Sequence, residues 1–174
     1  MPQFAERVAG LAPAGTPILL MGAPSDVDRA VTTLSRVGVD EIVGFLQWGM
    51  VEWRSEGFPV AVVPQITVHD LAAWLEQGRD VAIIDVRDPS EWDDGHIDGA
   101  VHLPMFEAVA RRAEVPDGRP KAVLCAGGLR SSAVIGALQR HGLEGFHNVT
   151  GGMSAWVKAG YGVTRRREQP PAAQ

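Results

Sequence analysis

Two stretches of this chain repeat each other, and the repeat limits the folds that the chain can adopt. When residues 17–60 are placed over residues 121–163, glycine, tryptophan and apolar residues recur in the same order. The matched pairs are Gly49 and Gly152, Met50 and Met153, Trp53 and Trp156, Gly57 and Gly160, Phe58 and Tyr161, and Val60 and Val163. With a single-residue insertion, the pairs Leu34 and Leu138, Arg36 and Arg140, and Gly38 and Gly142 also match. A repeat of this kind indicates that one structural unit occurs twice.

The pattern within each copy predicts an apolar strand, a short loop, a helix, a short strand and a second helix. In the first copy we expect the first strand at residues 18–21 and the first helix at residues 26–37. In the second copy we expect them at residues 122–125 and 130–141. A glycine follows each of these helices, and glycine commonly ends a helix.

The segment between the copies has no counterpart in the first copy. It predicts a helix at residues 68–77, a strand at 81–86, a helical turn at 89–94, a strand at 101–103 and a helix at 104–113. Strands that alternate with helices are typical of a parallel sheet covered by helices on both faces. The sequence therefore predicts an α/β fold of this type.

The two copies differ in completeness, and this difference sets the predicted domain boundaries. Residues 64–164 hold a complete α/β domain, whereas residues 1–63 hold only the back half of a second unit, because too few residues precede its first strand. Residues 165–174 are charged and then rich in proline and alanine, a composition that predicts a disordered tail.

Composition and charge exclude several classes of partner. Apolar residues make up 45% of the chain, and the formal net charge is -5 with acidic and basic residues mixed. Nucleic acids and anionic membranes attract basic surfaces, so we expect neither as a partner. No stretch is long and apolar enough to span a bilayer, and the N-terminus lacks the pattern of a signal peptide. We therefore expect a cytoplasmic protein.

The only cysteine, Cys125, ends a predicted strand, where open α/β sheets place their ligand sites. Gly127 and Gly128 follow it, and the next helix is expected to begin near Arg130. The N–H groups of such a loop can converge on one point above the sulfur, and the helix N-terminus and the arginine add positive potential. These features favour the thiolate, the reactive form of cysteine. A lone cysteine at a strand end is more often a small buried hydrophobe, but the loop around this one favours a reactive role.

Three separated motifs resemble those of the rhodanese family of sulfurtransferases. The first runs Ile84-Asp85-Val86-Arg87-Asp88-Pro89-Ser90-Glu91-Trp92 and continues with Gly95-His96-Ile97, Gly99-Ala100 and Leu103-Pro104. The second is the loop from Cys125 to Arg130, and the third is Gly151-Gly152-Met153 followed by Trp156. The motifs stand in the family's order and cover the whole second domain, which the resemblance identifies as a rhodanese-like domain.

The resemblance implies an enzyme with a covalent sulfur intermediate, similar to thiosulfate sulfurtransferase. The Cys125 thiolate takes a sulfane sulfur from a small donor, thiosulfate or a thiol persulfide, and the resulting persulfide passes it to a thiol or to cyanide. The expected catalytic residues are Cys125 and Arg130, the expected substrate-binding residues are Ala126, Gly127, Gly128, Leu129 and Ser131, and the expected structural supports are Asp85, Arg87 and His96.

The length of the loop separates sulfurtransferases from their relatives in this family. The sulfurtransferases have a six-residue loop, whereas the related phosphatases and arsenate reductases have one residue more. Residues 125–130 count six, which disfavours a phosphatase. The histidines show no metal-ligand spacing with one another or with Cys125, so we expect neither a metal nor another cofactor.

One departure from the family pattern bears on the substrate. Many single-domain rhodaneses carry arginine at the position of Ala126, and its loss reduces the attraction for a dianion such as thiosulfate. A thiol persulfide or a protein donor becomes more plausible. The alternative function is therefore a persulfide carrier or interaction module that serves a specific protein partner and turns over small molecules slowly. A non-catalytic scaffold is disfavoured by the intact loop.

The first copy is expected to be inactive. Our alignment places Met21 at the position of Cys125 and Asp26 at that of Arg130, and Pro24 replaces a loop glycine. An inactive unit followed by an active one resembles the C-terminal region of metallo-β-lactamase–rhodanese fusions. A half-unit leaves a sheet edge and apolar surface exposed. We therefore expect residues 1–63 to pack on the active domain, to self-associate or to bind a protein partner.

Overall fold

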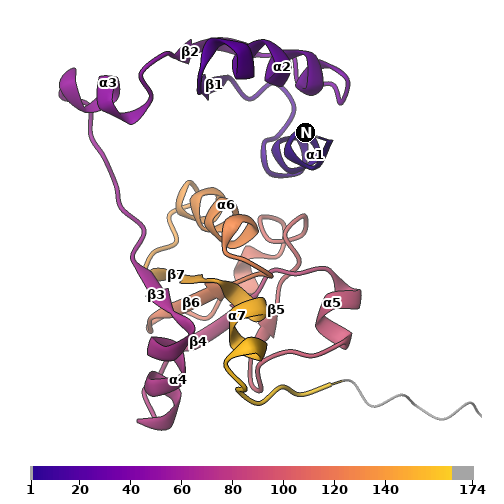
Figure 1. The fold of residues 1–174 in the computed structure, drawn as a ribbon, viewed down its shortest axis with the longest axis vertical. Helices are drawn as coiled ribbons and strands as arrows, with labels where there is room; N and C mark the ends of the chain where they lie inside the picture. Colours follow the sequence, from indigo (N-terminus) through magenta and orange to yellow (C-terminus); the bar gives the residue numbers. More distant parts are fainter. Residues whose placement is uncertain (1, 166–174) are drawn as a thin grey trace, which may run out of the picture. The chain divides into compact units, whose positions relative to one another are not determined.

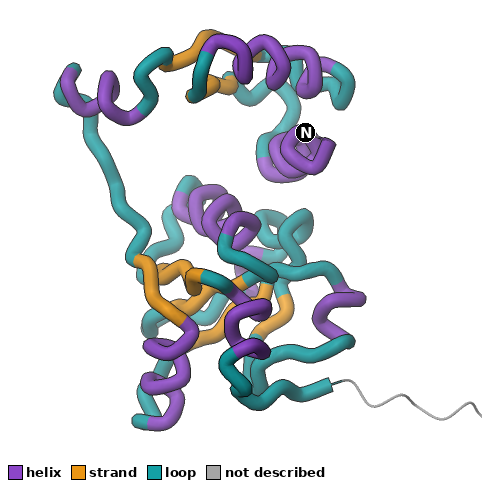
Figure 2. The backbone as a smooth tube through the Cα atoms, in the orientation of Figure 1, coloured by secondary structure: helices purple, strands orange, loops and turns teal. Residues whose placement is uncertain are grey.

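The computed structural model describes residues 2–165, which fold into two compact units. The chain divides after Val62; residues 1–62 are called unit 1 and residues 63–174 unit 2. Figure 2 shows that each unit contains both helices and strands. The predicted disordered tail lies, from residue 166 onward, outside the described residues.

Unit 2 is built on a five-stranded sheet with the strand order β3-β7-β6-β4-β5 (Figure 1). The strands are β3 (Gln65–Thr67), β4 (Ala82–Asp85), β5 (Val101–His102), β6 (Lys121–Leu124) and β7 (Phe146–Thr150). All neighbouring strands are parallel. Every residue of the central strands β4 and β6 is buried, as expected for a parallel sheet covered on both faces.

Helices cover the two faces of this sheet. The helices of unit 2 are α4 (Val68–Glu76), α5 (Pro89–Asp93), α6 (Leu129–Gln139) and α7 (Gly152–Lys158). On one face, Leu71 of α4 and Trp156 of α7 pack into a cluster that includes Leu124 and Val149 of the sheet. Helix α6 lies on the opposite face (Figure 1). The predicted α/β fold with a parallel sheet flanked by helices is confirmed.

The helix predicted at residues 104–113 is wrong. The segment consists of turns followed by a short 3-10 helix, η1 (Arg112–Glu114). The backbone N–H of Met105 donates to the carbonyl oxygen of Val86 (3.1 Å), which ties the start of the segment to the residue that follows β4. Met105 and Ala108 are both buried while Phe106 between them is 55% exposed, an arrangement that suits turns following the edge of the sheet.

Strand β3 was not predicted from the sequence. It has only three residues, which are too few to show the alternation of apolar and polar residues that marks a strand in a sequence. In the structure it pairs with β7. Helix α1 (Pro2–Leu11), which precedes the first repeat, was not predicted either.

Unit 1 is a smaller α/β assembly around a two-stranded parallel sheet. After α1, its elements in chain order are the strand β1 (Ile18–Met21), the helix α2 (Pro24–Ser35), the strand β2 (Ile42–Leu46) and the helix α3 (Met50–Ser55). The core of the unit is small and consists of Ala5, Leu20, Ala30 and Leu34 with a few half-buried neighbours. The order β1-α2-β2-α3 repeats the order β6-α6-β7-α7 of unit 2.

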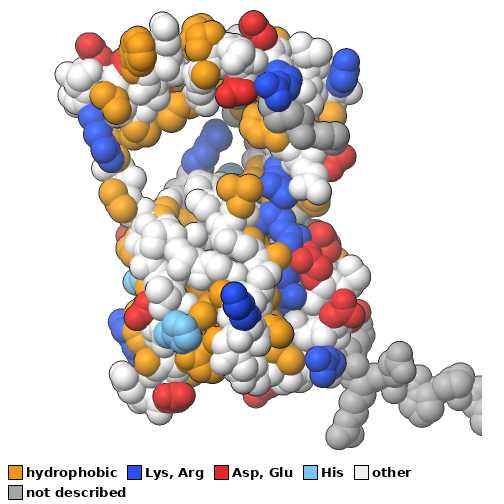
Figure 3. Space-filling view, in the orientation of Figure 1, with side chains coloured by type: hydrophobic (Ala, Val, Ile, Leu, Met, Phe, Trp, Pro, Cys, Tyr) orange, Lys and Arg blue, Asp and Glu red, His pale blue; other side chains and the backbone are white. Residues whose placement is uncertain are grey.

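Unit 1 exposes much more apolar surface than unit 2. Of the 16 exposed large hydrophobic residues in the described chain, 13 lie in unit 1. Leu19 and Met21 flank the buried Leu20 on β1 and are 47% and 53% exposed. Because side chains alternate along a strand, these two lie on the face of β1 opposite to Leu20. Apolar side chains are visible on the surface of unit 1 in Figure 3.

A close backbone contact joins α7 to the loop that follows β6. The N–H of Met153 donates to the carbonyl oxygen of Cys125 (2.8 Å), and the N–H of Ser154 donates to that of Ala126 (3.1 Å). A Cβ atom on Gly152 would collide with the Cys125 carbonyl oxygen, and Gly152 has a left-handed φ of 50°. Only glycine fits at this position, since it lacks a Cβ atom and tolerates positive φ.

The surroundings of Gly152 and Gly136 predict opposite effects on stability when each is replaced by alanine. Gly152→Ala should destabilise the protein by about 3 kcal/mol, because the new methyl group overlaps backbone that cannot move away. Gly136→Ala, at an open position of α6 with nothing within 4 Å, should stabilise it by about 0.5–1 kcal/mol. Urea unfolding monitored by tryptophan fluorescence measures both changes. Equal stability of the two variants would show that the contact is not tight.

Candidate active site

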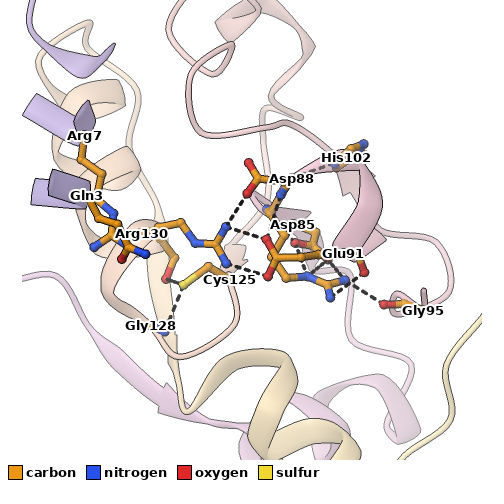
Figure 4. Close-up of polar contacts among 12 residues, drawn as sticks. Gln3, Arg7, Asp85, Asp88, Glu91, Gly95, His102, Cys125, Gly128 and Arg130 are labelled. Atoms are coloured by element: carbon orange, nitrogen blue, oxygen red, sulfur yellow. Dashed lines mark hydrogen bonds and ion pairs between the residues drawn. The ribbon is translucent and has the colours of Figure 1, made fainter. Parts of the chain in front are cut away.

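Cys125, labelled in Figure 4, is the first residue after β6 and therefore follows the carboxyl end of that strand. The residue is only 1% exposed. The backbone N–H of Gly128 donates to its sulfur at 3.1 Å, and the hydroxyl oxygen of Ser131 lies 3.5 Å from the same atom. Gly128 has a φ of 105°, which lets the loop curl back over the sulfur before α6 begins.

Burial and hydrogen bonding act on the Cys125 thiol in opposite directions. Burial raises its pKa, because a thiolate loses hydration in the interior. Hydrogen bonds from the Ser131 side chain and from the N–H groups of Ser131, Gly128 and Gly127 lower it, and their sum outweighs burial. The pKa of Cys125 therefore lies below the ordinary value for cysteine, which increases the thiolate fraction near neutral pH.

A chain of buried polar groups leads from Ser131 across two strands. The Ser131 hydroxyl donates to Oδ1 of Asn148 on β7 at 2.6 Å, and the Asn148 amide donates to Oε1 of Gln65 on β3 at 2.8 Å. Ser131 is fully buried and Asn148 is 5% exposed. One hydroxyl proton is thus shared between Asn148 and the sulfur of Cys125. Asn148 and Gln65 were not predicted from the sequence, because no motif marks them and they meet the loop only in the folded sheet.

Removal of the Ser131 hydroxyl should raise the pKa of Cys125, since the thiolate loses one hydrogen-bond donor. In Ser131→Ala, we expect the pH profile of Cys125 alkylation by iodoacetamide to move to higher pH. The control is Ser132→Ala, which removes a hydroxyl from the exposed neighbouring residue and should leave the profile unchanged. Superimposed profiles for both variants would show that Ser131 does not contact the thiolate.

The guanidinium group of Arg130 is paired with carboxylates. Its Nη1 and Nη2 atoms lie 2.6 and 2.7 Å from the two carboxylate oxygens of Glu91, and Nη1 lies 3.2 Å from Asp88 (Figure 4). The Glu91 carboxylate also accepts the backbone N–H of Asp88 at 3.1 Å, at the start of α5. The hydrogen bond from Arg130 lowers the pKa of Glu91 and keeps it ionised. The positive potential that Arg130 was expected to add to the loop is therefore largely neutralised.

Asp85 and Arg87, two of the predicted structural supports, form a buried ion pair. The Arg87 Nη2 atom lies 2.6 Å from Asp85 Oδ2, and both side chains are at most 7% exposed. Arg87 also donates to the carbonyl oxygens of Glu91 and Gly95, both at 2.8 Å. The guanidinium thereby links the end of β4 to the middle of α5 and to the turn that follows it.

His96, the third predicted support, stacks on an aromatic ring. Its imidazole lies 3.6 Å from the Trp92 ring centre at an angle of 5°, and its Nδ1 atom is 3.0 Å from the Trp92 carbonyl oxygen. His102 stacks on Trp92 at 4.6 Å and contacts the Arg87 carbonyl oxygen at 2.9 Å through Nε2. The three rings fix the segment that carries Glu91.

The other predicted binding residues line the loop to different extents. Ala126 and Gly128 are half-buried, and Gly127 is exposed. Leu129 is 70% exposed. The loop thus presents an apolar side chain to the solvent at the first residue of α6.

The corresponding loop of unit 1 corrects our alignment of the two copies. Strand β1 ends at Met21 as β6 ends at Leu124, so Gly22, not Met21, occupies the position of Cys125. Only two residues, 22 and 23, precede α2, whereas four residues, 125–128, precede α6. The second helical residue, which is Arg130 in α6, is Ser25 in α2 rather than Asp26. The loop of unit 1 has no thiol and is two residues shorter.

Residues 2–165 hold no group of three or more histidine, cysteine, aspartate or glutamate side chains that could bind a metal ion. None of the helices in this range is long and apolar enough to cross a membrane. The cytoplasmic location stays a prediction.

Residues 67–159, which contain α4 to α7 and the Cys125 loop, match the family of rhodanese-like domains. The chain belongs to this family. The chain also matches solved structures of rhodanese-like proteins. A rhodanese-like domain from an Anabaena protein, solved by NMR, is 32% identical with a TM-score of 0.56, and the match covers 65% of this chain and 89% of that one.

Curated relatives of the rhodanese-like domain include longer and shorter proteins. The probable adenylyltransferase/sulfurtransferase MoeZ of Mycobacterium tuberculosis is 39% identical over 95 residues, which cover 53% of this chain and 24% of that protein. A sulfurtransferase of Allochromatium vinosum is 32% identical over 99 residues, which cover 57% of this chain and 92% of that protein. The chain thus spans about a quarter of the first relative and nearly all of the second.

Proposed function

We propose that the protein is a sulfurtransferase that carries a sulfane sulfur on Cys125 as a persulfide. The observation that carries this proposal is the buried Cys125 sulfur, which accepts an N–H bond from Gly128 inside a six-residue loop. Family membership and relatives named sulfurtransferases support the general activity. The donor, the acceptor and the covalent intermediate belong to the proposal.

In the first half-reaction, the Cys125 thiolate attacks the sulfane sulfur of the donor. A sulfur–sulfur bond forms to Cys125, the sulfur–sulfur bond of the donor breaks, and its electron pair leaves with sulfite from thiosulfate or with a thiolate from a thiol persulfide. In the second half-reaction, a thiolate or cyanide attacks the outer sulfur and the electron pair returns to Cys125. Neither half-reaction requires a metal or a redox cofactor.

The loop provides groups that can stabilise Cys125 both as a thiolate and as a persulfide. The N–H groups of Gly127 and Gly128 hydrogen-bond the thiolate. Donors of this kind stabilise negative charge without reorganising, since the backbone already holds them in place. In the persulfide, the outer sulfur would extend from the Cys125 sulfur atom into the concave loop that ends at Arg130.

Intact-mass spectrometry tests the proposal directly. The reduced protein is incubated separately with thiosulfate and with glutathione persulfide, and we expect the gain of one sulfur atom, which cyanide removes. Cys125→Ser should gain none, because the chain has no other cysteine. Absence of the added sulfur in the wild-type protein with both donors would contradict a free-standing sulfurtransferase.

The second candidate function is a persulfide carrier that serves a specific protein partner. The observation that favours it is Leu129, an apolar residue that is 70% exposed within the loop. An exposed apolar side chain beside the reactive sulfur offers a partner protein apolar area to bury on docking. A carrier would form the Cys125 persulfide but turn over small donors and acceptors slowly, so steady-state rates separate the two functions.

For unit 1 we propose self-association with a second copy of the chain. Both edges of the β1–β2 sheet lack a strand partner among residues 2–165, although the corresponding strands of unit 2 have neighbours on both sides. Free parallel edges and exposed apolar residues promote pairing between chains. Trp48 and Val51, 69% and 74% exposed, lie beside this sheet in sequence and add to the apolar surface.

Light scattering coupled to size-exclusion chromatography tests the self-association. We expect the mass to rise toward that of a dimer with concentration, and Trp48→Ser to shift the transition to at least tenfold higher concentration. Val157→Ser, which removes a 58% exposed apolar residue from α7 of unit 2, should not shift it. A monomer mass at every concentration would rule out the second copy as the partner of unit 1.

A further inference from the structure

The only arginine in the Cys125 loop is bound by two carboxylates. Glu91 contacts it through both carboxylate oxygens, and Asp88 contacts it through one. Bidentate pairs of this geometry are the strongest type of arginine–carboxylate contact. The exposed fractions of the side chains are 17% for Arg130, 32% for Glu91 and 57% for Asp88, so the cluster faces the solvent at one side.

This cluster carries a net charge of -1, because one guanidinium is opposed by two carboxylates. The nearby Asp85–Arg87 pair is buried and neutral as a whole, so it does not offset that charge. The remaining attraction for an anion comes from the N–H groups of the loop, which contact the sulfur of Cys125 itself. Ala126, the loop residue next to Cys125, adds no charge.

A negative cluster affects sulfur donors according to their charge. Thiosulfate is a dianion, and it must approach a thiolate beside a cluster that is itself negative. A persulfide on an uncharged carrier meets less repulsion, and one on a cationic carrier is attracted. The exposed apolar Leu129 in the same loop also suits a carrier without negative charge.

We propose that Glu91, with Asp88, is a specificity-determining residue that neutralises Arg130 and makes the Cys125 site select sulfur donors with an uncharged or cationic carrier over anionic donors. The inference rests on the proposed sulfur transfer. For such a donor, the Cys125 thiolate and R–S–SH give the Cys125 persulfide and R–S⁻. The new sulfur–sulfur bond replaces the old one, the electron pair leaves on the carrier thiolate, and the proton stays on the transferred sulfur.

Donors that share the persulfide group but differ in the charge of the carrier isolate the effect of donor charge on the rate of sulfur loading. We use the persulfides of cysteamine, 2-mercaptoethanol and 3-mercaptopropionate, whose carriers are cationic, uncharged and anionic, together with thiosulfate. The rate of sulfur loading on Cys125 is followed by intact mass. In the wild-type protein the rates should fall in that order of carriers, and thiosulfate should be slowest. Added salt should reduce the differences, because it screens exposed charges.

Glu91→Gln keeps the size of the side chain and an oxygen for the Asp88 N–H but removes one negative charge. We expect it to raise the ratio of the thiosulfate rate to the 2-mercaptoethanol persulfide rate roughly fivefold. Asp88→Asn removes a charge from the more exposed partner and should raise the same ratio by a smaller factor. This second variant keeps the test valid if Glu91→Gln unfolds the α5 segment.

The matched control is Glu114→Gln. Glu114 also forms a bidentate pair with an arginine, Arg111, at 2.7 and 2.8 Å, but it lies on η1, which contributes no residue to the loop. The donor ratio should stay at the wild-type value in this variant. A purely structural role of Glu91 would slow all donors equally and leave the ratio unchanged.

The outcomes separate this inference from the proposed function. If the wild-type protein loads sulfur but the donor ratio is unchanged in both Glu91→Gln and Asp88→Asn, the specificity role is refuted while sulfur transfer stands. If no donor loads Cys125 in the wild-type protein, the proposed function and the inference fail together. A ratio that rises equally in Glu114→Gln would also refute the role of Glu91, since the effect would then be one of net charge.

Discussion

The buried ion pair between Asp85 and Arg87 organises the carboxyl end of the sheet. Asp85 ends β4, and Arg87 reaches from it to the backbone carbonyls of Glu91 and Gly95. Breaking a buried pair of this kind by removing one partner typically costs about 3–5 kcal/mol, because the other charge is left without compensation. The pair fixes α5, α5 presents Glu91, and Glu91 holds Arg130 of the cysteine loop. The position of Arg130 in the loop therefore depends on an ion pair two contacts away from it.

The chemistry of Cys125 results from two opposing effects. The end of a buried parallel strand removes the sulfur from water, which disfavours a thiolate. The Ser131 hydroxyl and the N–H groups of the loop then donate to the sulfur where the chain leaves the sheet, and together they lower the thiol pKa more than burial raises it. Gly128 and Gly152 allow this geometry, because the backbone passes too close to itself for a side chain at Gly152 and requires positive φ at both.

The two repeats show how the same order of elements leads to different degrees of burial. In unit 2, neighbouring strands and helices α4 and α7 cover the strands β6 and β7. In unit 1, the corresponding strands have no further neighbours within the described chain, and residues of β1 that would be covered in a complete sheet are exposed. A shorter loop after β1 leaves no room for the cysteine cradle. The repeat thus keeps the folding pattern but not the site.

The sequence by itself determined the fold class, the strand-loop-helix context of Cys125 and most element positions, because these follow from local periodicity and from glycine positions. It did not reveal the turns at residues 104–113, where the backbone of Met105 is bonded to Val86, a residue far away in the sequence. Only the tertiary structure decided which groups meet the loop. Asn148 and Gln65 come from strands β7 and β3, and Glu91 comes from α5, so no local pattern could place them beside Ser131 and Arg130. Charge neutralisation acts through space, and the charge that a substrate meets at Arg130 therefore depends on residues some 40 positions away in the chain.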